Sequence, residues 1–287
     1  MPFSKIIVTG GSGKTGRAVL RDLTANGFNV LNLDRSACPQ APCPTRLVDL
    51  TSLGETVDAF AGADAVVHLA AIPNDSIHAA ERTFRENVAS TFNVFHAAHL
   101  AGIRHVVWAS SETVLGLPFR KVRPAVAPID ETHAPYPEST YSLSKVVGEQ
   151  LADQYARWHG MRFVGLRFSN VMEPHDYARF STWQDDPAAR RWNLWGYVDA
   201  RDCAAACRLA LHADTAGSEN MIIAAADTCM ALDNPRLLAA EFPGTQLAPG
   251  TGPHETLLSI AKARRLIGYQ PVHSWRLASS HAAATTR

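Results

Sequence analysis

The sequence predicts an α/β protein with a Rossmann-type, doubly wound parallel sheet and a small C-terminal substrate-binding lobe. Strand-like and helix-like segments alternate through the first two thirds of the chain, and a glycine-rich turn joins the first strand to the first helix. Beyond residue 170 the chain becomes rich in Trp, Arg, Asp and Pro. We therefore expect one domain over residues 1–170 and a lobe over residues 171–287, interleaved with the last elements of the sheet. The lobe is expected to bind substrate, because open α/β sheets bind ligands at the carboxyl ends of their strands.

The first strand-turn-helix unit carries a glycine pattern that is typical of dinucleotide-binding domains. An apolar strand over residues 5–9 enters a turn over residues 10–16, a helix is predicted over residues 17–25, and a second strand ends at Asp34. Glycines permit a tight turn and let a pyrophosphate approach the amides of a helix N-terminus. The acid about 20 residues later stands where a ribose 2′-hydroxyl is bound. A glycine-rich turn alone also occurs for steric reasons, but this order of elements favours a dinucleotide site at Gly10, Gly13 and Gly16.

Further strands and helices follow in alternation. Strands are predicted over residues 46–48, 65–71, 105–109 and 162–167, and helices over residues 81–101 and 141–159. Residues 116–140 contain five prolines and are predicted to form a long loop, which in a compact domain is typical of a functional or disordered segment. The Ala-, Ser- and Thr-rich end of the chain, residues 278–287, is expected to fray.

Composition excludes several classes of function. Lys plus Arg and Asp plus Glu both number 27, and no basic stripe is interleaved with aromatic residues, so nucleic acid is not an expected partner. The first apolar run is short and enters the glycine turn, so we expect neither a signal peptide nor a membrane span. The five cysteines form no metal-ligand pattern, and Cys203 and Cys207 are expected to pack as small apolar residues. A cytoplasmic protein without a metal fits these features.

Tyr141 and Lys145 lie four residues apart, on one face of a predicted helix. A nearby ammonium favours the phenolate, so we expect the pKa of Tyr141 to fall from about 10 toward neutrality. Tyr141 then takes a proton from a substrate hydroxyl, or returns it to a carbonyl, while hydride moves to or from a nicotinamide. An exposed Lys and a half-buried Tyr on an ordinary helix give the same spacing, but the dinucleotide pattern favours the catalytic interpretation.

Three polar residues follow the strand over residues 105–109 and are expected to face the cofactor crevice. A hydroxyl at this place hydrogen-bonds the reacting oxygen and orients it, although serine is also well suited to capping a turn. We assign Ser111 to the site and Ser110 to structure. Glu112 is a candidate second acid or base, and an exposed loop carboxylate is the alternative.

From residue 6 to about residue 208, the chain resembles an extended short-chain dehydrogenase/reductase of the NAD-dependent epimerase/dehydratase family. Each matching motif is weak alone, but their order along the chain is specific. The matching segments are residues 9–16, Asp34, residues 49–50, residues 68–71, residues 87–88, residues 110–111, Tyr141 with Lys145, residues 166–171 and residues 197–199.

The resemblance implies roles for individual residues. Ser111, Tyr141 and Lys145 resemble the catalytic trio of the family, and Lys145 is also expected to hold the nicotinamide ribose. Asn87 is expected to brace the strand ends near the nicotinamide, with simple backbone bridging as the alternative. Asn170 is expected to contact substrate, unless it only holds a turn. The residues expected to contact the cofactor are Gly10, Gly13, Lys14, Thr15, Gly16, Asp34, Arg35, Asp49, Leu50, Leu69, Ala70, Ala71, Asn87 and Lys145.

The chain departs from the family pattern where substrate specificity is expected to arise. Leu115 stands before a glycine where family epimerases and dehydratases usually carry Tyr, and the lobe is short for a nucleotide-sugar enzyme. Residues 180–183 resemble a segment of uronate dehydrogenases, which oxidise a free sugar acid. Arg179, Arg190 and Arg191 are candidates for clamping a carboxylate or phosphate, because a guanidinium fork matches either anion. Solvated ion pairs in an Asp-rich loop are the alternative. The predicted substrate contacts are Ser111, Glu112, Asn170, Arg179 and Arg191.

NAD is the expected cofactor, because Asp34 repels a 2′-phosphate and accepts a hydrogen bond from a free 2′-hydroxyl. Arg35 and Lys14 place positive charge beside the same ribose, which reduces the expected preference for NAD over NADP. The expected reaction is hydride transfer from a carbinol of a sugar or sugar acid, with Tyr141 as general base. Two alternatives remain: a nucleotide-sugar epimerase or dehydratase that keeps NAD bound, and a cofactor sensor without turnover, which Tyr141 and Lys145 disfavour. The resemblance also implies a homodimer formed through the helices over residues 81–101 and 141–159.

Overall fold

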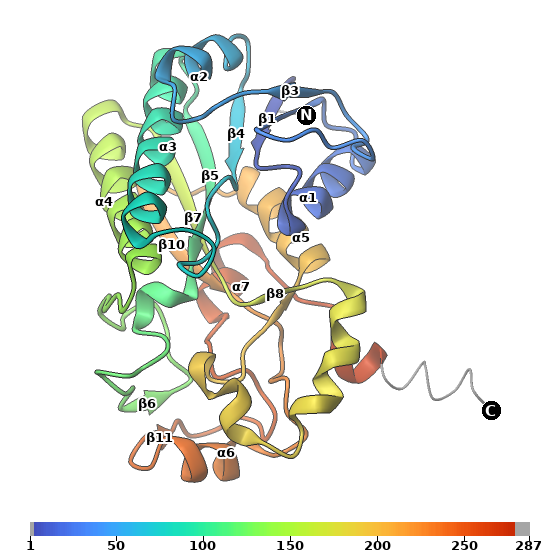
Figure 1. Cartoon of the computed structure of the whole chain (residues 1–287), viewed down its shortest axis with the longest axis vertical. Helices are drawn as coiled ribbons and strands as arrows, with labels where there is room; N and C mark the ends of the chain where they lie inside the picture. Colours follow the sequence, from blue (N-terminus) through green and yellow to red (C-terminus); the bar gives the residue numbers. More distant parts are fainter. Residues whose placement is uncertain (1–2, 279–287) are drawn as a thin grey trace, which may run out of the picture.

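Seven parallel strands form the central sheet of the protein, which we describe from a computed structural model over residues 3–278. The strand order is β10-β7-β5-β4-β1-β2-β3, so the chain winds outward from β1 in both directions (Figure 1). The prediction of a Rossmann-type, doubly wound parallel sheet is confirmed. The strands are β1 (Ile6–Thr9), β2 (Val30–Asp34), β3 (Thr45–Leu47), β4 (Ala65–His68), β5 (His105–Ser111), β7 (Arg162–Phe168) and β10 (Ser218–Ile223).

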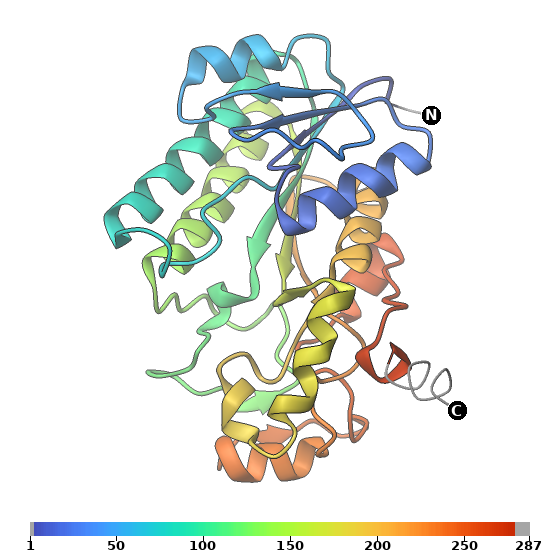
Figure 2. The same cartoon turned by 45° about the vertical axis from the view of Figure 1, so that its right-hand side comes forward.

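Helices cover both faces of this sheet, because successive side chains of a strand point to opposite faces. In β1, Ile6 and Val8 pack into one apolar cluster and Ile7 into another, and all three are fully buried. The first cluster contains residues of α1 (Lys14–Ala25) and α5 (Ala200–Leu211), and the second contains residues of α2 (Leu53–Ala59), α3 (Ala80–Leu100) and α4 (Thr140–His159). Figure 2 shows α3 and α4 on one side of the sheet and α1 with α5 on the other.

The lobe lies beyond the carboxyl ends of the strands (Figures 1 and 2). Its two small parallel sheets pair β8 (Val171–Met172) with β9 (Val198–Asp199) and β6 (Val126–Ala127) with β11 (Gln246–Leu247). The remaining elements of this part of the chain are three 3-10 segments, η1 (Glu112–Leu115), η2 (Pro174–Trp183) and η3 (Pro187–Asn193), and the helices α6 (Asn234–Glu241) and α7 (Ala261–Ile267).

The division of the chain at residue 170 does not coincide with a division in space. Strand β10 comes from the segment after residue 170, where interleaving with the last elements of the sheet is expected, and it pairs with β7 along its whole length. The crossover through α5 buries Met221, Ile222 and Ile223 completely, so this strand belongs to the main core. In the other direction, β6 comes from the proline-rich loop and joins the lobe by pairing with β11.

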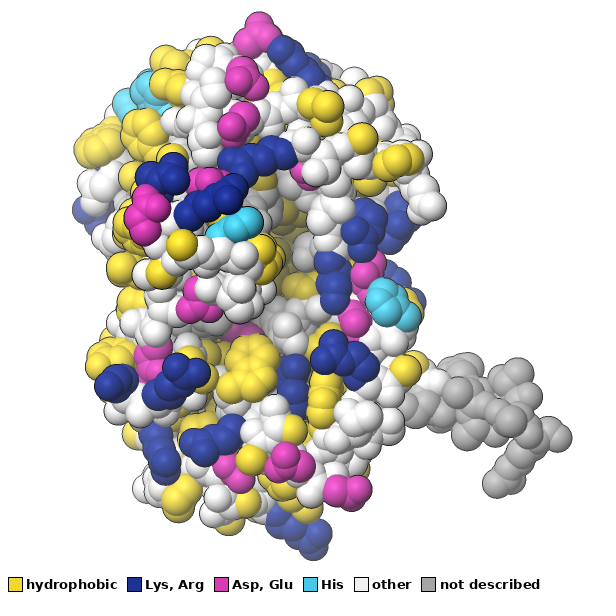
Figure 3. Space-filling model, viewed as in Figure 1, with side chains coloured by type: hydrophobic (Ala, Val, Ile, Leu, Met, Phe, Trp, Pro, Cys, Tyr) yellow, Lys and Arg dark blue, Asp and Glu magenta, His cyan; other side chains and the backbone are white. Residues whose placement is uncertain are grey.

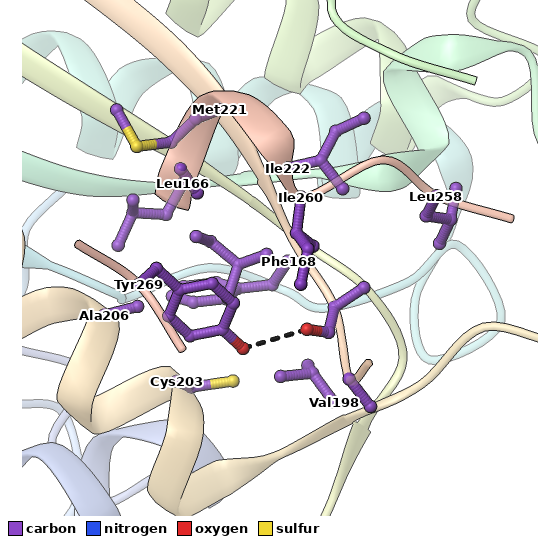
Figure 4. Close-up of a cluster of buried hydrophobic side chains, with 14 of the residues drawn as sticks. Leu166, Phe168, Val198, Cys203, Ala206, Met221, Ile222, Leu258, Ile260 and Tyr269 are labelled. Atoms are coloured by element: carbon purple, nitrogen blue, oxygen red, sulfur yellow. Dashed lines mark hydrogen bonds between the residues drawn. The ribbon is translucent and has the colours of Figure 1, made fainter. Parts of the chain in front are cut away.

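A cluster of buried side chains ties β7, β10 and α5 to the C-terminal segments (Figure 4). The Tyr269 hydroxyl is buried there and donates a hydrogen bond of 2.9 Å to the Ala224 carbonyl oxygen. Cys203 and Cys207 are free and fully buried in the same apolar cluster, as predicted. Of the end that was expected to fray, residues 279–287 lie outside the described residues. Within residues 3–278, no helix has both the length and the apolar character required to span a membrane.

Candidate active site

A cleft of about 1120 Å³ opens between the carboxyl ends of the strands and the lobe. Figure 3 shows it as the hollow near the centre of the face, bordered by Lys and Arg side chains. Its walls include the glycine turn after β1, the ends of β4 and β5, the first turns of α4 and the segment that follows β7. This is the edge at which parallel α/β sheets bind ligands.

The glycine turn forms one end of the cleft, and its geometry fits a pyrophosphate. Gly10 has φ +73°, and a Cβ there would lie 2.6 Å from Cα of Ala70. A Cβ at Gly16 would collide with the backbone of Gly10 and Gly11, so the helix packs directly on the turn. By contrast, a Cβ at Gly13 would have only the Gly10 oxygen nearby, at 3.3 Å, and would project into open space. No side chain caps the N-terminus of α1, which leaves its first amides to bind an anion.

Asp34 lies at the end of β2, beside this turn. Its carboxylate accepts hydrogen bonds of 3.0 Å from the amides of Ser12 and Ser36. Arg35 is paired with Glu86 at 2.9 Å and with Asp49 at 3.1 Å. The cation expected to favour a 2′-phosphate is therefore already engaged, and the hydrogen bond to Glu86 is the main cause that raises the pKa of Arg35.

Lys14 is also engaged, because its Nζ donates a 2.6 Å hydrogen bond to Asp176 of the lobe. Asp49 is exposed and does not line the cleft, whereas its neighbour Leu50 does. Asp49 instead accepts hydrogen bonds from the amide and hydroxyl of Thr51. The other residues predicted to contact the cofactor all line the cleft: Gly10, Gly13, Lys14, Thr15, Gly16, Asp34, Arg35, Leu50, Leu69, Ala70, Ala71, Asn87 and Lys145.

Asn87 of α3 holds the loop that leaves β4. Its Oδ1 accepts a 2.8 Å hydrogen bond from the Ile72 amide, and its Nδ2 donates to the Ile72 oxygen at 3.1 Å. The same Nδ2 donates to Ser144 Oγ of α4 at 3.3 Å. Asn87 thereby ties the loop of Ala70 and Ala71 to the helix that carries Tyr141.

The predicted catalytic trio comes together from β5 and α4. A capping box between Ser139 and Ser142 starts α4 just before Tyr141. Lys145 Nζ donates a 2.8 Å hydrogen bond to the Ala109 oxygen of β5 and lies 5.8 Å from the centre of the Tyr141 ring. Ser111 ends β5, where its hydroxyl accepts hydrogen bonds from the amide and hydroxyl of Thr113. All three members of the trio line the cleft.

The expected lowering of the Tyr141 pKa is not met in the protein alone. Burial raises the pKa of Tyr141 to about 12, opposed by the Ser111 hydroxyl and reinforced by the charge of Glu112. Burial also lowers the pKa of Lys145 to about 8, against the opposing charge of Glu149. Desolvation outweighs the attraction between the two side chains, because the hydroxyl and the ammonium are both withdrawn from solvent.

Glu112 is buried, so the alternative of an exposed loop carboxylate is wrong. It begins η1 and is only 2 % exposed. Its Oε1 accepts a 3.2 Å hydrogen bond from Asn193 Nδ2, whereas its Oε2 is buried without a hydrogen-bond partner. Burial raises the pKa of Glu112 to about 7, although Ser169, Asn193 and Arg190 oppose the shift.

The three arginines of the lobe do not form an anion clamp in the cleft. Arg191 pairs with Glu241 at 3.3 Å, and Arg179 is exposed, 5.8 Å from the Trp183 ring. Neither residue lines the cleft, so the structure does not place these two predicted substrate contacts at the site. Arg190 is buried, and it donates 3.0 Å hydrogen bonds to Asn170 Oδ1 and to the Gly196 oxygen. It therefore holds Asn170, which does line the cleft.

Sequence reasoning missed several residues that line this end of the cleft, and two of them are large side chains. Trp192 lines the cleft, and its ring lies 5.0 Å from the Arg190 guanidinium. Arg120, from the proline-rich loop, lies at the mouth and is exposed. A cluster of Trp and Arg between residues 172 and 196 was visible in the sequence, but its irregular 3-10 backbone gives no periodicity from which to tell inward from outward positions.

Comparison with known proteins identifies the family of the chain. The sequence profile described as "NAD dependent epimerase/dehydratase family" matches residues 6–225. The chain belongs to this family. Within the family, it is 31 % identical over 189 residues to a uronate dehydrogenase of Pseudomonas putida, covering 63 % of this chain and 67 % of that one. It is 29 % identical over 245 residues to an L-arabinose 1-dehydrogenase (NAD(P)(+)) of Haloferax volcanii, covering 80 % and 92 % of the two chains.

A solved structure shares the fold over nearly the whole chain. A short-chain dehydrogenase/reductase superfamily protein from Agrobacterium tumefaciens, with bound NAD, superposes with a TM-score of 0.76 at 26 % identity. The match covers 99 % of this chain and 97 % of that one. The expected resemblance to extended short-chain dehydrogenase/reductases is confirmed. The chain is thus an enzyme of the NAD-dependent sugar dehydrogenase and epimerase type.

Proposed function

We propose that the protein oxidises a carbinol of a free sugar or sugar acid, with NAD as hydride acceptor and Tyr141 as general base. The observation that carries this proposal is the convergence of Ser111, Tyr141 and Lys145 on the same cleft as the open glycine turn. The similarity to two dehydrogenases of free sugars or sugar acids supports this substrate class.

NAD is the proposed cofactor, since the cleft offers a fitting set of donors and acceptors. The uncapped amides at the start of α1 and the space beside Gly13 suit the pyrophosphate. Asp34 suits the ribose hydroxyl, and it disfavours a 2′-phosphate while Arg35 remains paired with Glu86 and Asp49. Lys145, one helical turn after Tyr141, is placed to hold the nicotinamide ribose.

The chain's own residues supply the proton chemistry. NAD, when bound, supplies the acceptor for the hydride that leaves the carbinol carbon. Tyr141 takes the proton of the carbinol oxygen, so that the carbon–oxygen bond becomes a carbonyl. Ser111 donates a hydrogen bond to the same oxygen and orients it. The ammonium of Lys145 opposes the cost of forming a phenolate, which burial has made large in the free protein.

Net accumulation of reduced cofactor is the measurement that tests this proposal. Purified protein is mixed with NAD or NADP and, one at a time, free aldoses, uronic acids and nucleotide sugars, and the absorbance of reduced cofactor is followed. Tyr141→Phe should lose nearly all turnover, by about 100-fold or more, and still bind NAD with nearly unchanged affinity. Substantial remaining turnover in this variant would remove Tyr141 from the role of base.

An epimerase or dehydratase that keeps NAD bound is the second candidate, because the matching family includes both chemistries and both require the same trio. Conversion of a nucleotide sugar, detected by chromatography without any net reduction of cofactor, would favour it over the dehydrogenase. The two activities therefore separate in a single set of reactions.

We further propose that the protein is a homodimer in the cytoplasm. The outer faces of α3 and α4 carry exposed apolar side chains, with Phe92 40 %, Leu100 56 % and Trp158 65 % exposed. Burying such side chains against a second copy is favourable in water. The five cysteines are all free, which suits a reducing compartment.

A further inference from the structure

The substrate end of the cleft contains a carboxylate that the proposed chemistry leaves without a role. Glu112 follows Ser111 directly, lines the cleft and is 2 % exposed. It accepts a hydrogen bond from Asn193, while its second oxygen lacks a partner of good geometry, as does the buried hydroxyl of nearby Ser169. Tyr141 lines the same cleft, so Glu112 and the proposed base border one space. A buried polar atom without a partner is costly unless a ligand or water satisfies it.

Within residues 3–278 Glu112 forms no ion pair, although the charge of Arg190 acts to lower its pKa. Arg190 approaches it, but the hydrogen bonds of Arg190 go to Asn170 and to the Gly196 oxygen. Lys145 is held by the Ala109 oxygen on the nicotinamide side. A substrate carboxylate bound beside Glu112 would therefore meet a like charge without a compensating clamp.

Trp192 supplies a second feature of this end of the cleft. Its indole is partly exposed and forms part of the wall near Asn170. An aromatic face together with a few hydrogen-bond acceptors suits a neutral polyhydroxylated ring, which has apolar C–H faces and hydroxyl donors at its rim. Asn170, which lines the cleft, adds an amide group that fits the same pattern.

We propose that Glu112 accepts a hydrogen bond from a substrate hydroxyl next to the reacting carbinol, and that the enzyme thereby selects neutral free sugars over sugar acids. This inference rests on the proposed dehydrogenase function and narrows its substrate class. Glu112 binds and selects in this scheme, while Tyr141 remains the base. The partner of its free oxygen is a hydroxyl group, so an analogue lacking that hydroxyl leaves the buried oxygen unsatisfied.

Matched pairs of substrates test the inference. Each aldohexose is paired with the hexuronic acid of the same stereochemistry, and kcat/KM for NAD reduction is measured at pH 8 for both. The wild type should favour the neutral sugar by about tenfold or more, because like charges in a desolvated site repel strongly. Glu112→Gln keeps the shape and the contact with Asn193, removes the charge, and should narrow that ratio by about tenfold.

Glu138→Gln is the matched control, because it changes a carboxylate at the mouth of the same cleft that binds only the backbone amides of Arg120 and Lys121. It should leave the ratio unchanged. A second test needs no variant and compares the wild type at pH 6 and pH 8. Protonation of Glu112 at the lower pH should reduce the ratio of kcat/KM for the neutral sugar over the uronic acid.

The outcomes separate the two proposals. The role of Glu112 would be overturned if the wild type preferred the uronic acid. It would also be overturned if neither Glu112→Gln nor pH changed the ratio of kcat/KM for sugar over acid. Both results would leave the dehydrogenase proposal intact. No reduction of NAD with any sugar or sugar acid would overturn the dehydrogenase, and the inference with it.

Discussion

Glu112 illustrates, at the scale of single residues, how burial rather than residue type sets the chemistry of this cleft. The same carboxylate on an open loop would be a solvated anion, but here it is enclosed by η1, η3 and the turn after β7. Tyr141 and Lys145 show the same effect with opposite signs, since burial raises the pKa of the phenol and lowers that of the amine. In all three cases the neutral form is favoured.

Glu112→Gln should change stability in a pH-dependent way. The folded protein holds the pKa of Glu112 at about 7, above its ordinary value of 4.5. The raised pKa means that protonated Glu112 contributes to the free energy of unfolding of the wild type. This contribution is fully present below about pH 4.5 and is lost as the pH rises through 7. At about 1.4 kcal/mol for each pKa unit, the variant should gain about 3 kcal/mol over the wild type at pH 8 and little at pH 5. Urea unfolding of both proteins at pH 5 and pH 8 measures this difference in the free energy of unfolding. If the difference were the same at the two pH values, burial would not raise the pKa of Glu112.

Asp34→Ala should shift cofactor preference toward NADP. The variant removes the negative charge at the place of a 2′-phosphate and leaves the positive charge of Arg35 in the next position of the chain. We expect the ratio of kcat/KM for NAD over NADP to fall by about tenfold, from the loss of one hydrogen bond to a charged group. Asp58→Asn is a suitable control, because Asp58 is an exposed acid of α2 that pairs with Arg46 and lies outside the cleft. A ratio that Asp34→Ala does not move would mean that Asp34 does not contact the ribose.

At the scale of elements, the site depends on how the ends of β5 and β7 are tied to α4. Glu149 lies one helical turn after Lys145 and accepts hydrogen bonds from Ser110 at 2.7 Å and from Arg167 at 2.8 Å. All of these groups are buried. The Ser110 hydroxyl thus serves the structure, although both Ser110 and Ser111 line the cleft. The ion pair of Glu149 with Arg167 joins the two strands to the helix and places a negative charge near Lys145.

Glu149→Gln should therefore lower the pKa of Lys145 below its present value of about 8. Removing one member of a buried ion pair should also cost about 3–5 kcal/mol of stability. The pH at which NAD affinity falls, followed by fluorescence titration, should move to lower values in this variant. Ser110→Ala removes only a hydrogen bond, so it should cost about 1 kcal/mol and leave the pH dependence in place. If the two variants shift the pH dependence equally, the charge of Glu149 is not the cause.

At the scale of the whole molecule, ion pairs connect the sheet domain with the lobe across the cleft. Lys14 and Arg17 of α1 pair with Asp176 and Glu173 of the lobe at 2.6 and 2.9 Å. Such partly exposed pairs each contribute about 1 kcal/mol or less, so the apolar packing of α5 and β10 is what holds the two parts together. The cleft is therefore built on a continuous core rather than between two independent units.

The proposed homodimer can be tested by a substitution on the exposed face of α4. Trp158→Glu places a charge on the exposed face of α4 and should weaken dimerisation by about 100-fold, through lost apolar burial and a desolvated charge. Sedimentation velocity over a range of concentrations measures this effect. Val272→Glu is the control, since Val272 is exposed to a similar degree at 67 % but lies outside α3 and α4. A wild type that sediments as a monomer at all concentrations would contradict the dimer itself.

The order of strands and helices, the glycine turn and the pairing of Tyr141 with Lys145 were all evident in the sequence, because each is a local pattern with a fixed spacing. Positions close to these motifs, such as Asn87 and Ser111, were also predictable through the family resemblance, and both line the cleft. The placement of β10 was less evident, since a strand's membership in a sheet depends on pairing with β7 far away in the sequence.

Local patterns in the sequence were enough to predict the fold class and the family, and to propose the glycine turn as the cofactor site. Which polar side chains of the lobe face inward became evident from the folded chain. Arg179, Arg190 and Arg191 look alike in the sequence, yet one is exposed, one is buried behind Asn170 and one pairs with Glu241. Likewise, the burial of Glu112 comes from η3, some 80 residues later in the chain. Burial and charge balance are set by contacts between distant segments, and no local pattern encodes them.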